Sequence, residues 1–174
     1  MKESANPVID AILKRRSIRK YSGKPVNKFD IDLLLTAAMY APSARNEQPW
    51  HFIVIDDRGL LNRIRKVHPY ASMLSDAALA ILVCGDENLE LSKAYWPVDC
   101  SAATQNILLA AHAIGLGAVW LGVYPRQERQ SAIKEIFKLP SHIHPFSLIS
   151  IGHPAEEKAV PDRFREDRIR WNEW

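Results

Sequence analysis

The stretch DCSAATQNILLAAHAIGLGAVWLGVY, residues 99–124, decides how this chain can fold. Apolar side chains surround the segment Asp99–Ile114 on almost every side, which predicts a helix buried in the core. Gly115 or Gly117 is expected to end this helix, because glycine readily adopts the left-handed conformation that closes many helices. Ala118–Tyr124 then has the apolar character of a buried strand. A buried helix that leads directly into a buried strand indicates a layered domain.

Helical and strand-like segments alternate along the rest of the chain. Helices are expected from Pro7 to about Arg16 and at Lys28–Tyr40, Arg58–Lys66 and Gln127–Phe137. Strands are expected at His51–Asp56, Ala77–Cys84 and Phe146–Ile151. The second strand is a nearly continuous apolar run, which is typical of a central strand. The alternation indicates an α/β or α+β sandwich with helices on both faces of a sheet.

The chain has 174 residues, enough for a single domain with a sizeable core. It shows no internal repeat, linker or low-complexity tract, so we expect one domain over residues 1–174. The last segment, His153–Trp174, is charged and contains proline. We expect it to form an extended tail that packs on another surface.

The composition excludes several classes of protein. Hydrophobic residues make up 47%, which argues against global disorder. No apolar run reaches the ~20 residues that span a bilayer, and residues 1–7 lack the apolar core of a secretory signal. Cys84 and Cys100 form neither a CxxC pair nor a zinc-binding set, so we expect no metal site. A reducing, cytoplasmic location fits this cysteine usage.

Positive charge is mild in total but unevenly placed. The net charge is +3, and the basic residues that cluster near the two ends of the chain are Lys14, Arg15, Arg16, Arg19, Lys20, Arg163, Arg165, Arg168 and Arg170. Such clusters suit nucleic acid, a membrane surface or one small phosphate group. Trp171 and Trp174 would favour single-stranded nucleic acid. No RRM, KH or helix-turn-helix pattern occurs, so we expect neither nucleic acid nor membrane as a partner.

The run Arg15-Arg16-Ser17-Ile18-Arg19-Lys20-Tyr21 combines four cations with a hydroxyl. Guanidinium groups pair with two phosphate oxygens at once, and a serine adds another hydrogen bond. The run follows the C-terminal end of the first helix, which carries negative partial charge. A bound anion must therefore be held by the arginine side chains. A solvated basic helix end is the alternative interpretation.

Two further segments suggest a flat polar ligand. The loop Pro42–Trp50 offers hydroxyl and amide groups that suit the uracil-like edge of a flavin, although an ordinary turn-rich connection has the same composition. The glycines of residues 115–122 do not match the dinucleotide-binding fingerprint, since they follow a helix and enter a strand. Gly122, inside a strand, indicates the close approach of another group, such as a flat ring.

Other kinds of catalytic site find little support. The chain contains neither GxSxG nor HExxH. We expect His112 to be a satisfied core histidine, Cys84 to be a core thiol, and Asp99 to favour the N-terminus of its helix. Cys100 has no histidine at a spacing that would activate it. No catalytic side chain is predicted.

In this order, the arginine run, the Pro-Ser-x-x-Asn-x-Gln-Pro-Trp loop of residues 42–50 and the glycine segment resemble the nitroreductase family of FMN-dependent oxidoreductases. The resemblance covers roughly Pro7–Trp171. It implies an α+β fold, a three-layer α-β-α sandwich with a mainly antiparallel central sheet. It also implies an intertwined homodimer with two FMN molecules at the interface. The tail, about residues 153–174, would then wrap the partner subunit.

The resemblance also implies roles for individual residues. One subunit would bind FMN through Arg15, Arg16, Ser17 and Arg19, and the other through Pro42, Ser43, Ala44 and Asn46. The backbone amides of Leu121 and Gly122 would face flavin N5 and O4, and Arg163 would bind the phosphate. Gln48 belongs to the loop motif without an assigned contact. Longer members carry a polar and a basic side chain near the flavin where this chain has Tyr70 and Met73.

The implied reaction is a ping-pong hydride transfer on FMN. NADH or NADPH would reduce the flavin, and a small-molecule acceptor such as a nitro compound, a quinone or a flavin would then take its place. A cation near N1–O2 of the reduced flavin, Arg15 or Arg19, would stabilise its negative charge. Tyr95 and Trp96 are candidates for an aromatic wall, or simply pack in the core. The alternatives are a flavin carrier or sensor without turnover, or a specialised relative such as a reductive dehalogenase.

Overall fold

The computed structural model describes residues 6–174. A four-stranded sheet in the order β1–β2–β4–β3 forms its frame, and each neighbouring pair is antiparallel. The strands are β1 (Trp50–Ile55), β2 (Leu79–Asp86), β3 (Gly117–Gly122) and β4 (Ile143–Gly152). Residues 1–5, where the sequence predicts no secretory signal, lie outside the described part of the chain.

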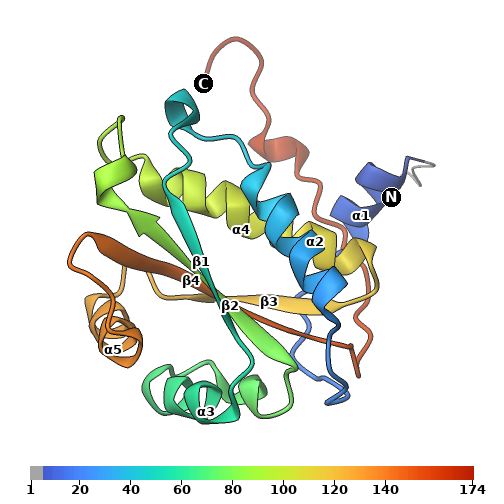
Figure 1. Ribbon diagram of the computed structural model, residues 1–174. Helices are drawn as coiled ribbons and strands as arrows, with labels where there is room; N and C mark the ends of the chain where they lie inside the picture. Colours follow the sequence, from blue (N-terminus) through green and yellow to red (C-terminus); the bar gives the residue numbers. More distant parts are fainter. Residues whose placement is uncertain (1–5) are drawn as a thin grey trace.

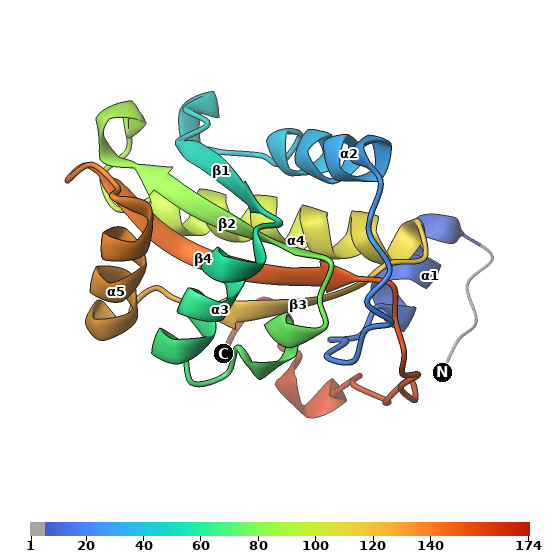
Figure 2. The same ribbon diagram turned by 60° about the horizontal axis from the view of Figure 1, so that its bottom comes forward.

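Helices cover both faces of this sheet (Figures 1 and 2). One layer contains α2 (Lys28–Met39) and α4 (Trp96–Ala113), with α1 (Pro7–Lys14) packed against α4. The opposite layer contains α3 (Arg58–Val67) and α5 (Gln127–Phe137). The predicted three-layer sandwich with an antiparallel sheet is confirmed.

Strand β2 separates two hydrophobic cores. All eight of its residues are buried. Its alternate side chains point to opposite faces, as in any strand. Leu82 and Cys84 therefore pack with the α3–α5 layer, whereas Ile81 and Val83 pack with the α2–α4 layer. Cys84 is the predicted core thiol, and burial raises its pKa to about 12.

Two elements begin three residues before their predicted starts, and a proline lies in each added segment. Helix α4 begins at Trp96 instead of Asp99, with Pro97 in the first turn, where proline needs no hydrogen-bonded N–H. Strand β4 begins at Ile143 and contains Pro145. The register of β2 and β4 shifts at this proline, and such a bulge tolerates its missing donor.

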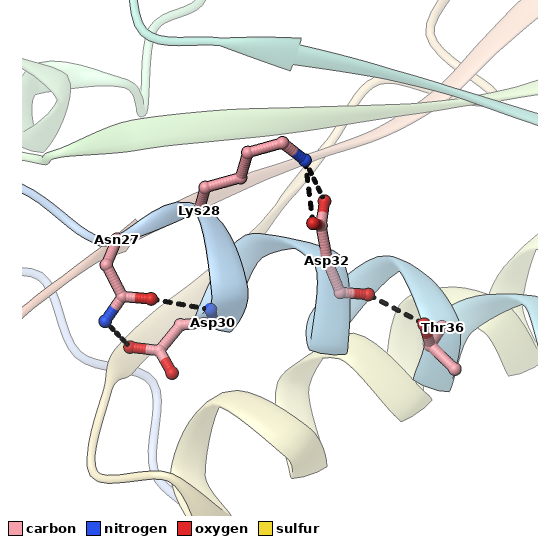
Figure 3. Close-up of polar contacts among 5 residues, drawn as sticks. All are labelled: Asn27, Lys28, Asp30, Asp32 and Thr36. Carbon is pink, nitrogen blue, oxygen red and sulfur yellow. Dashed lines mark hydrogen bonds and ion pairs between the residues drawn. The ribbon is translucent and has the colours of Figure 1, made fainter.

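Helix α2, which precedes the Pro42–Trp50 loop, starts at a well-defined N-cap. The Asn27 side chain accepts a hydrogen bond from Asp30 N at 2.8 Å and donates one to the Asp30 carboxylate at 2.7 Å. Lys28 pairs with Asp32 at 2.7 Å, one turn along the helix (Figure 3). The cap satisfies a free N–H of the first turn, so it fixes where the helix begins.

The tail after β4 is extended, as predicted. A bridge between Tyr21 and Pro154 starts it, and nearly every residue from Glu157 onward is exposed. None of the helices within residues 6–174 has the length and apolar character needed to cross a membrane.

Candidate functional site

The arginine run lies along the free edge of β3. Ile18 N donates a 3.0 Å hydrogen bond to Ala118 O, and Ser17 forms a parallel bridge with Ala118. A Cβ on Gly117 would lie 2.7 Å from a methyl group of Ile18, so glycine is required there for this close approach. Gly115, with φ of 80°, is the residue that closes α4. The two glycines thus have different roles.

A buried tyrosine fixes the end of the run. The Tyr21 hydroxyl lies 2.8 Å from Ile18 O and 3.1 Å from Ser150 O on β4. Burial, the largest influence, raises the pKa of Tyr21 to about 12, so the hydroxyl stays a donor. The arginines are therefore presented from a rigid backbone.

The C-terminal tail is fastened to the same run. Lys158 Nζ donates to Ser17 O at 2.7 Å, and Arg16 Nε donates to Ala159 O at 3.1 Å. The Glu156 carboxylate accepts from Arg19 N at 2.6 Å, and this bond is the main cause of its lowered pKa. These contacts join the first and last parts of the chain (Figure 1).

The C-terminal tail brings Arg163 close enough to Arg15 for their charges to interact. Burial, followed by the charges of Arg16 and Arg163, lowers the pKa of Arg15. Within residues 6–174 no carboxylate lies at ion-pair distance from any of the three. Arg16 and Arg163 also line a cavity of ≈ 280 Å³. Three gathered guanidiniums without a counter-ion have the charge and the donor groups that suit an anion such as a phosphate.

At the other end of β3, Gly122 turns its backbone groups away from β4. Groups of an antiparallel strand point alternately to its two sides. Ala118 bonds outward to Ile18, so Gly122 also points outward, whereas Leu121 points toward β4. A Cβ on Gly122 would meet no atom within 4 Å. Open space therefore lies over one face of the strand at Gly122, next to a backbone N–H that points away from β4.

Two side chains that the sequence did not single out, His68 and Arg129, contact the Gly122 carbonyl. His68 Nε2 lies 3.1 Å from Gly122 O, and Arg129 Nη1 donates to the same oxygen at 2.7 Å. The Arg129 guanidinium lies over the Tyr70 ring, 5.3 Å from its centroid. No motif links these residues, which lie on different elements, so only the fold reveals the cluster.

The Pro42–Trp50 loop is rigid and internally bonded. Ser43 Oγ accepts from Gln48 N at 3.0 Å, and Gln48 Nε2 donates to Asn46 Oδ1 at 3.1 Å. Arg45, Asn46 and Gln48 all have positive φ, between 47° and 56°. Such conformations persist only where surrounding contacts impose them.

A buried carboxyl ties this loop to α4. Asp99 Oδ1 accepts from Ala44 N at 3.0 Å, and its other oxygen faces Glu47. Glu47 Oε2 accepts from the backbone N–H groups of Leu91 and Ser92. Burial, the largest influence, raises the pKa of Asp99, and the nearby Glu47 acts in the same direction. Asp99 therefore does more than favour its helix N-terminus.

One chain does not bring the loop to the arginine run. In both ribbon views the turn at Ala44–Asn46 lies at one end of the molecule, away from the segment that follows α1 (Figures 1 and 2). The sequence-predicted residues thus form two groups. The group along β3 and its edge contains Arg15, Arg16, Ser17, Arg19, Leu121, Gly122 and Arg163. The separate loop contains Pro42, Ser43, Ala44 and Asn46.

Comparison with known proteins identifies the fold family. A model described as the nitroreductase family matches residues 12–78 and 65–153. The chain belongs to this family. A relative from Methanothermobacter thermautotrophicus, provisionally named NADH dehydrogenase/NAD(P)H nitroreductase, is 51% identical over 173 residues, which are 99% of this chain and 91% of the relative.

Solved nitroreductase structures match the whole sandwich. A similar crystal structure from Parabacteroides distasonis, with the same provisional name, has a TM-score of 0.93 at 42% identity, covering 97% of this chain and 99% of its own. A nitroreductase-named protein from Desulfovibrio desulfuricans, solved in complex with FMN, has a TM-score of 0.86 at 31% identity, covering 98% and 99%.

Within this nitroreductase fold, the two positions that depart from the family pattern differ in environment. Met73 is buried in the α3–α5 core, whereas Tyr70 is 66% exposed and lies against Arg129. Trp96 is half-buried and packs on His144, with ring centroids 5.5 Å apart, so its contacts within the chain are those of a packing residue.

The expectation for His112 was wrong. The side chain is only half-buried, since it lies near the end of α4 and lines a cavity of ≈ 480 Å³ under the tail. Burial, followed by the charge of Arg15, lowers its pKa. His112 therefore belongs to the surroundings of the basic cluster and not to the core.

Proposed function

We propose that this protein is an FMN-dependent oxidoreductase that uses NADH or NADPH to reduce a small-molecule acceptor, such as a nitro compound, a quinone or a free flavin. Its membership of the nitroreductase family and its similarity to a structure solved with FMN support the class of reaction. The observation that carries the proposal is the edge of β3. Unpaired guanidiniums lie at one end of this edge, and a free amide beside open space lies at the other.

The residues of this edge fit the two ends of an FMN molecule. Arg15 and Arg163 hold the phosphate, because their charges act on each other and neither forms an ion pair with a carboxylate of the described residues. Ser17 and Arg19 lie between phosphate and ring, since the run continues along β3. Arg16 shares the phosphate site and also secures the tail through Ala159 O.

The ring end is held by backbone. Gly122 presents its N–H outward to N5 and O4, and Leu121, whose amide points toward β4, supports that position. When bound, FMN supplies the hydride chemistry, accepting hydride from the nicotinamide and passing it to the acceptor. The chain itself provides orientation, charge and one open face, so donor and acceptor bind there in turn.

We further propose that the working unit is a homodimer. The Pro42–Trp50 loop is too far from the arginine run to complete the site of its own chain, so Pro42, Ser43, Ala44 and Asn46 serve the partner's flavin. An apolar groove of ≈ 430 Å³ between α1, α2 and α4, lined by Val8, Tyr40 and Leu109 among others, suits such an interface. The exposed tail of residues 153–174 would wrap the partner subunit.

Extraction of the chromophore tests the cofactor. The purified protein should release FMN, identified by mass, and not FAD, because the basic cluster is built for a terminal phosphate. A protein that carries FAD, or that ignores added FMN, would contradict the assignment.

Anaerobic kinetics test the reaction. NADH or NADPH should bleach the flavin absorbance, and double-reciprocal plots at several acceptor concentrations should be parallel, as for ping-pong kinetics. Bleaching without turnover on any acceptor would indicate a carrier or sensor. Intersecting lines would indicate separate donor and acceptor sites.

A further inference from the structure

The cluster around the Gly122 carbonyl contains a cation without a counter-ion. Arg129 lies in the first turn of α5 and donates one N–H to Gly122 O at 2.7 Å. No acidic side chain in the described chain pairs with it. The guanidinium is half-buried and lies over Tyr70, which limits its rotamers. A held, uncompensated cation beside a free amide is suited to an electron-rich partner.

His68 fixes the same carbonyl and is held neutral. Its Nδ1 accepts from Tyr70 N at 3.3 Å, so its Nε2 carries the proton that faces Gly122 O at 3.1 Å. Burial, the largest influence, lowers the pKa of His68, and the charge of Arg129 acts in the same direction, whereas the hydrogen bond to Gly122 O opposes them. Of the two described side chains that contact Gly122 O, Arg129 is therefore the one that carries a positive charge.

The arginine run cannot supply charge at this place. It meets β3 at Ala118, four residues before Gly122, which corresponds to ~13 Å along a strand. Arg15, Arg16 and Arg163 gather at that distant end. One edge thus carries two separate cationic groups, which are the arginine cluster near Ala118 and Arg129 at the Gly122 carbonyl.

We propose that Arg129, clamped between the Gly122 carbonyl and the Tyr70 ring, is the positioning residue that stabilises negative charge on the part of the flavin bound at Gly122. This inference rests on the proposed function of the β3 edge. His68 holds the same peptide in place without adding charge. A fixed cation close to the flavin favours reduction of the ring, because it stabilises the negative charge that reduction creates and the protein does not have to reorganise around that charge.

Reduction potentials of the FMN-loaded protein test this role. Arg129→Gln keeps a donor of similar shape for Gly122 O and removes the charge, so the equilibrium constant for two-electron reduction should fall about tenfold, or ~30 mV. Arg129→Lys should recover most of the loss. The matched control is Arg126→Gln, which removes an exposed cation from the start of the same helix and should change nothing.

Tyr70→Leu provides a second test if the first variant is unstable. It leaves the charge but removes the ring that holds it, so the potential should fall by a smaller factor. The proposal would be overturned if the equilibrium constant for reduction changed less than twofold in both Arg129→Gln and Tyr70→Leu. A change in NADPH-over-NADH preference at unchanged potential would overturn it too, since Arg129 would then bind the nucleotide.

A measurement on the apoprotein separates this inference from the proposed function. The imidazole NMR signals of His68 should titrate at higher pH in Arg129→Gln than in the wild type, because a neighbouring positive charge is gone. If that shift occurs but the wild type takes up no FMN, the cluster stands and the cofactor assignment fails. If FMN binds and the potential does not move, only the role of Arg129 fails.

Discussion

The edge of β3 and the Pro42–Trp50 loop carry the two halves of the candidate site, and they are built in opposite ways. The edge holds Arg15, Arg129 and Arg163 with no acidic partner in the described structure. The loop is held by hydrogen bonds, within itself between Ser43 and Gln48 and to α4 between Ala44 and Asp99. The edge therefore presents positive charge that is not neutralised by the described residues, whereas the loop presents a backbone held in one conformation.

This contrast explains why one region was easier to interpret. A concentration of arginines is visible in the sequence, and its chemistry does not depend on the fold. A shape held by three residues with positive φ is visible only in the structure. Under the proposed homodimer the two halves also differ in what they need, because the edge acts within its own chain and the loop acts on the flavin of the partner.

The largest expected effect comes from separating the two halves. Leu109→Arg places a charge in the apolar groove of α1, α2 and α4, so the protein should become monomeric. FMN affinity should then fall about 100-fold or more, since several hydrogen bonds from the partner's loop are lost together. Sedimentation and flavin titration measure the two effects. Val67→Arg, an equivalent change in the α3–α5 layer, is the control, and a monomer that still binds FMN tightly would show that each chain suffices alone.

Removing charge from the edge should have the next largest effect. Arg15→Ala and Arg163→Ala should each weaken FMN binding about 10- to 100-fold, because a hydrogen bond to a charged group contributes about 1.5–3 kcal/mol. Fluorescence titration measures the affinity. Arg165→Ala is a matched control, since it removes an exposed cation from the same tail. Equal affinity in all variants would mean that the cluster does not bind the phosphate.

Two glycines of β3 test the geometry of the edge without changing its charge. Gly122→Ala should leave the melting temperature of the apoprotein unchanged, because its Cβ meets no atom, but should weaken FMN binding about tenfold by occupying the ring's place. Gly117→Ala should lower the melting temperature of the apoprotein, with a destabilisation of about 1–3 kcal/mol, because the added methyl group meets Ile18. If Gly122→Ala binds FMN normally, the ring does not approach this strand.

The smallest effect concerns the carboxyl that holds the loop. The folded state raises the pKa of Asp99, so its contribution to stability is complete below the pKa of the unfolded state, about 3.9, and is lost as pH rises through the folded value. Asp99→Asn keeps the acceptor for Ala44 N and removes this titration. The melting temperature of the variant relative to wild type should therefore increase between pH 4 and pH 8. A constant difference would show that Asp99 is not protonated preferentially in the fold.

The sequence predicted the layers but not every contact that builds the site. Hydrophobic periodicity located all five helices and four strands of residues 6–174, because burial on one or both faces leaves a pattern. Its errors lie where local chemistry competes with that pattern, as at Pro97 and Pro145. His112 was misplaced because an apolar helix was taken to be buried along its whole length.

The candidate site was predictable only where residues are close in sequence. The arginine run and the loop are continuous, so composition and resemblance identified them. His68, Gly122 and Arg129 come from three elements that only the antiparallel order of the sheet brings together. Neither spacing nor composition indicates such a cluster.

The bond between Arg16 and Ala159 joins residues 143 positions apart, and Lys158 reaches Ser17 across 141 positions. During biosynthesis the arginine run is made early, and the segment that fastens it follows more than 140 residues later. The proposed phosphate-binding half of the site therefore stays incomplete until residues 156–163 have been made. We expect cofactor capture to wait for this segment, and a chain cut before residue 155 to retain the sandwich but bind flavin poorly.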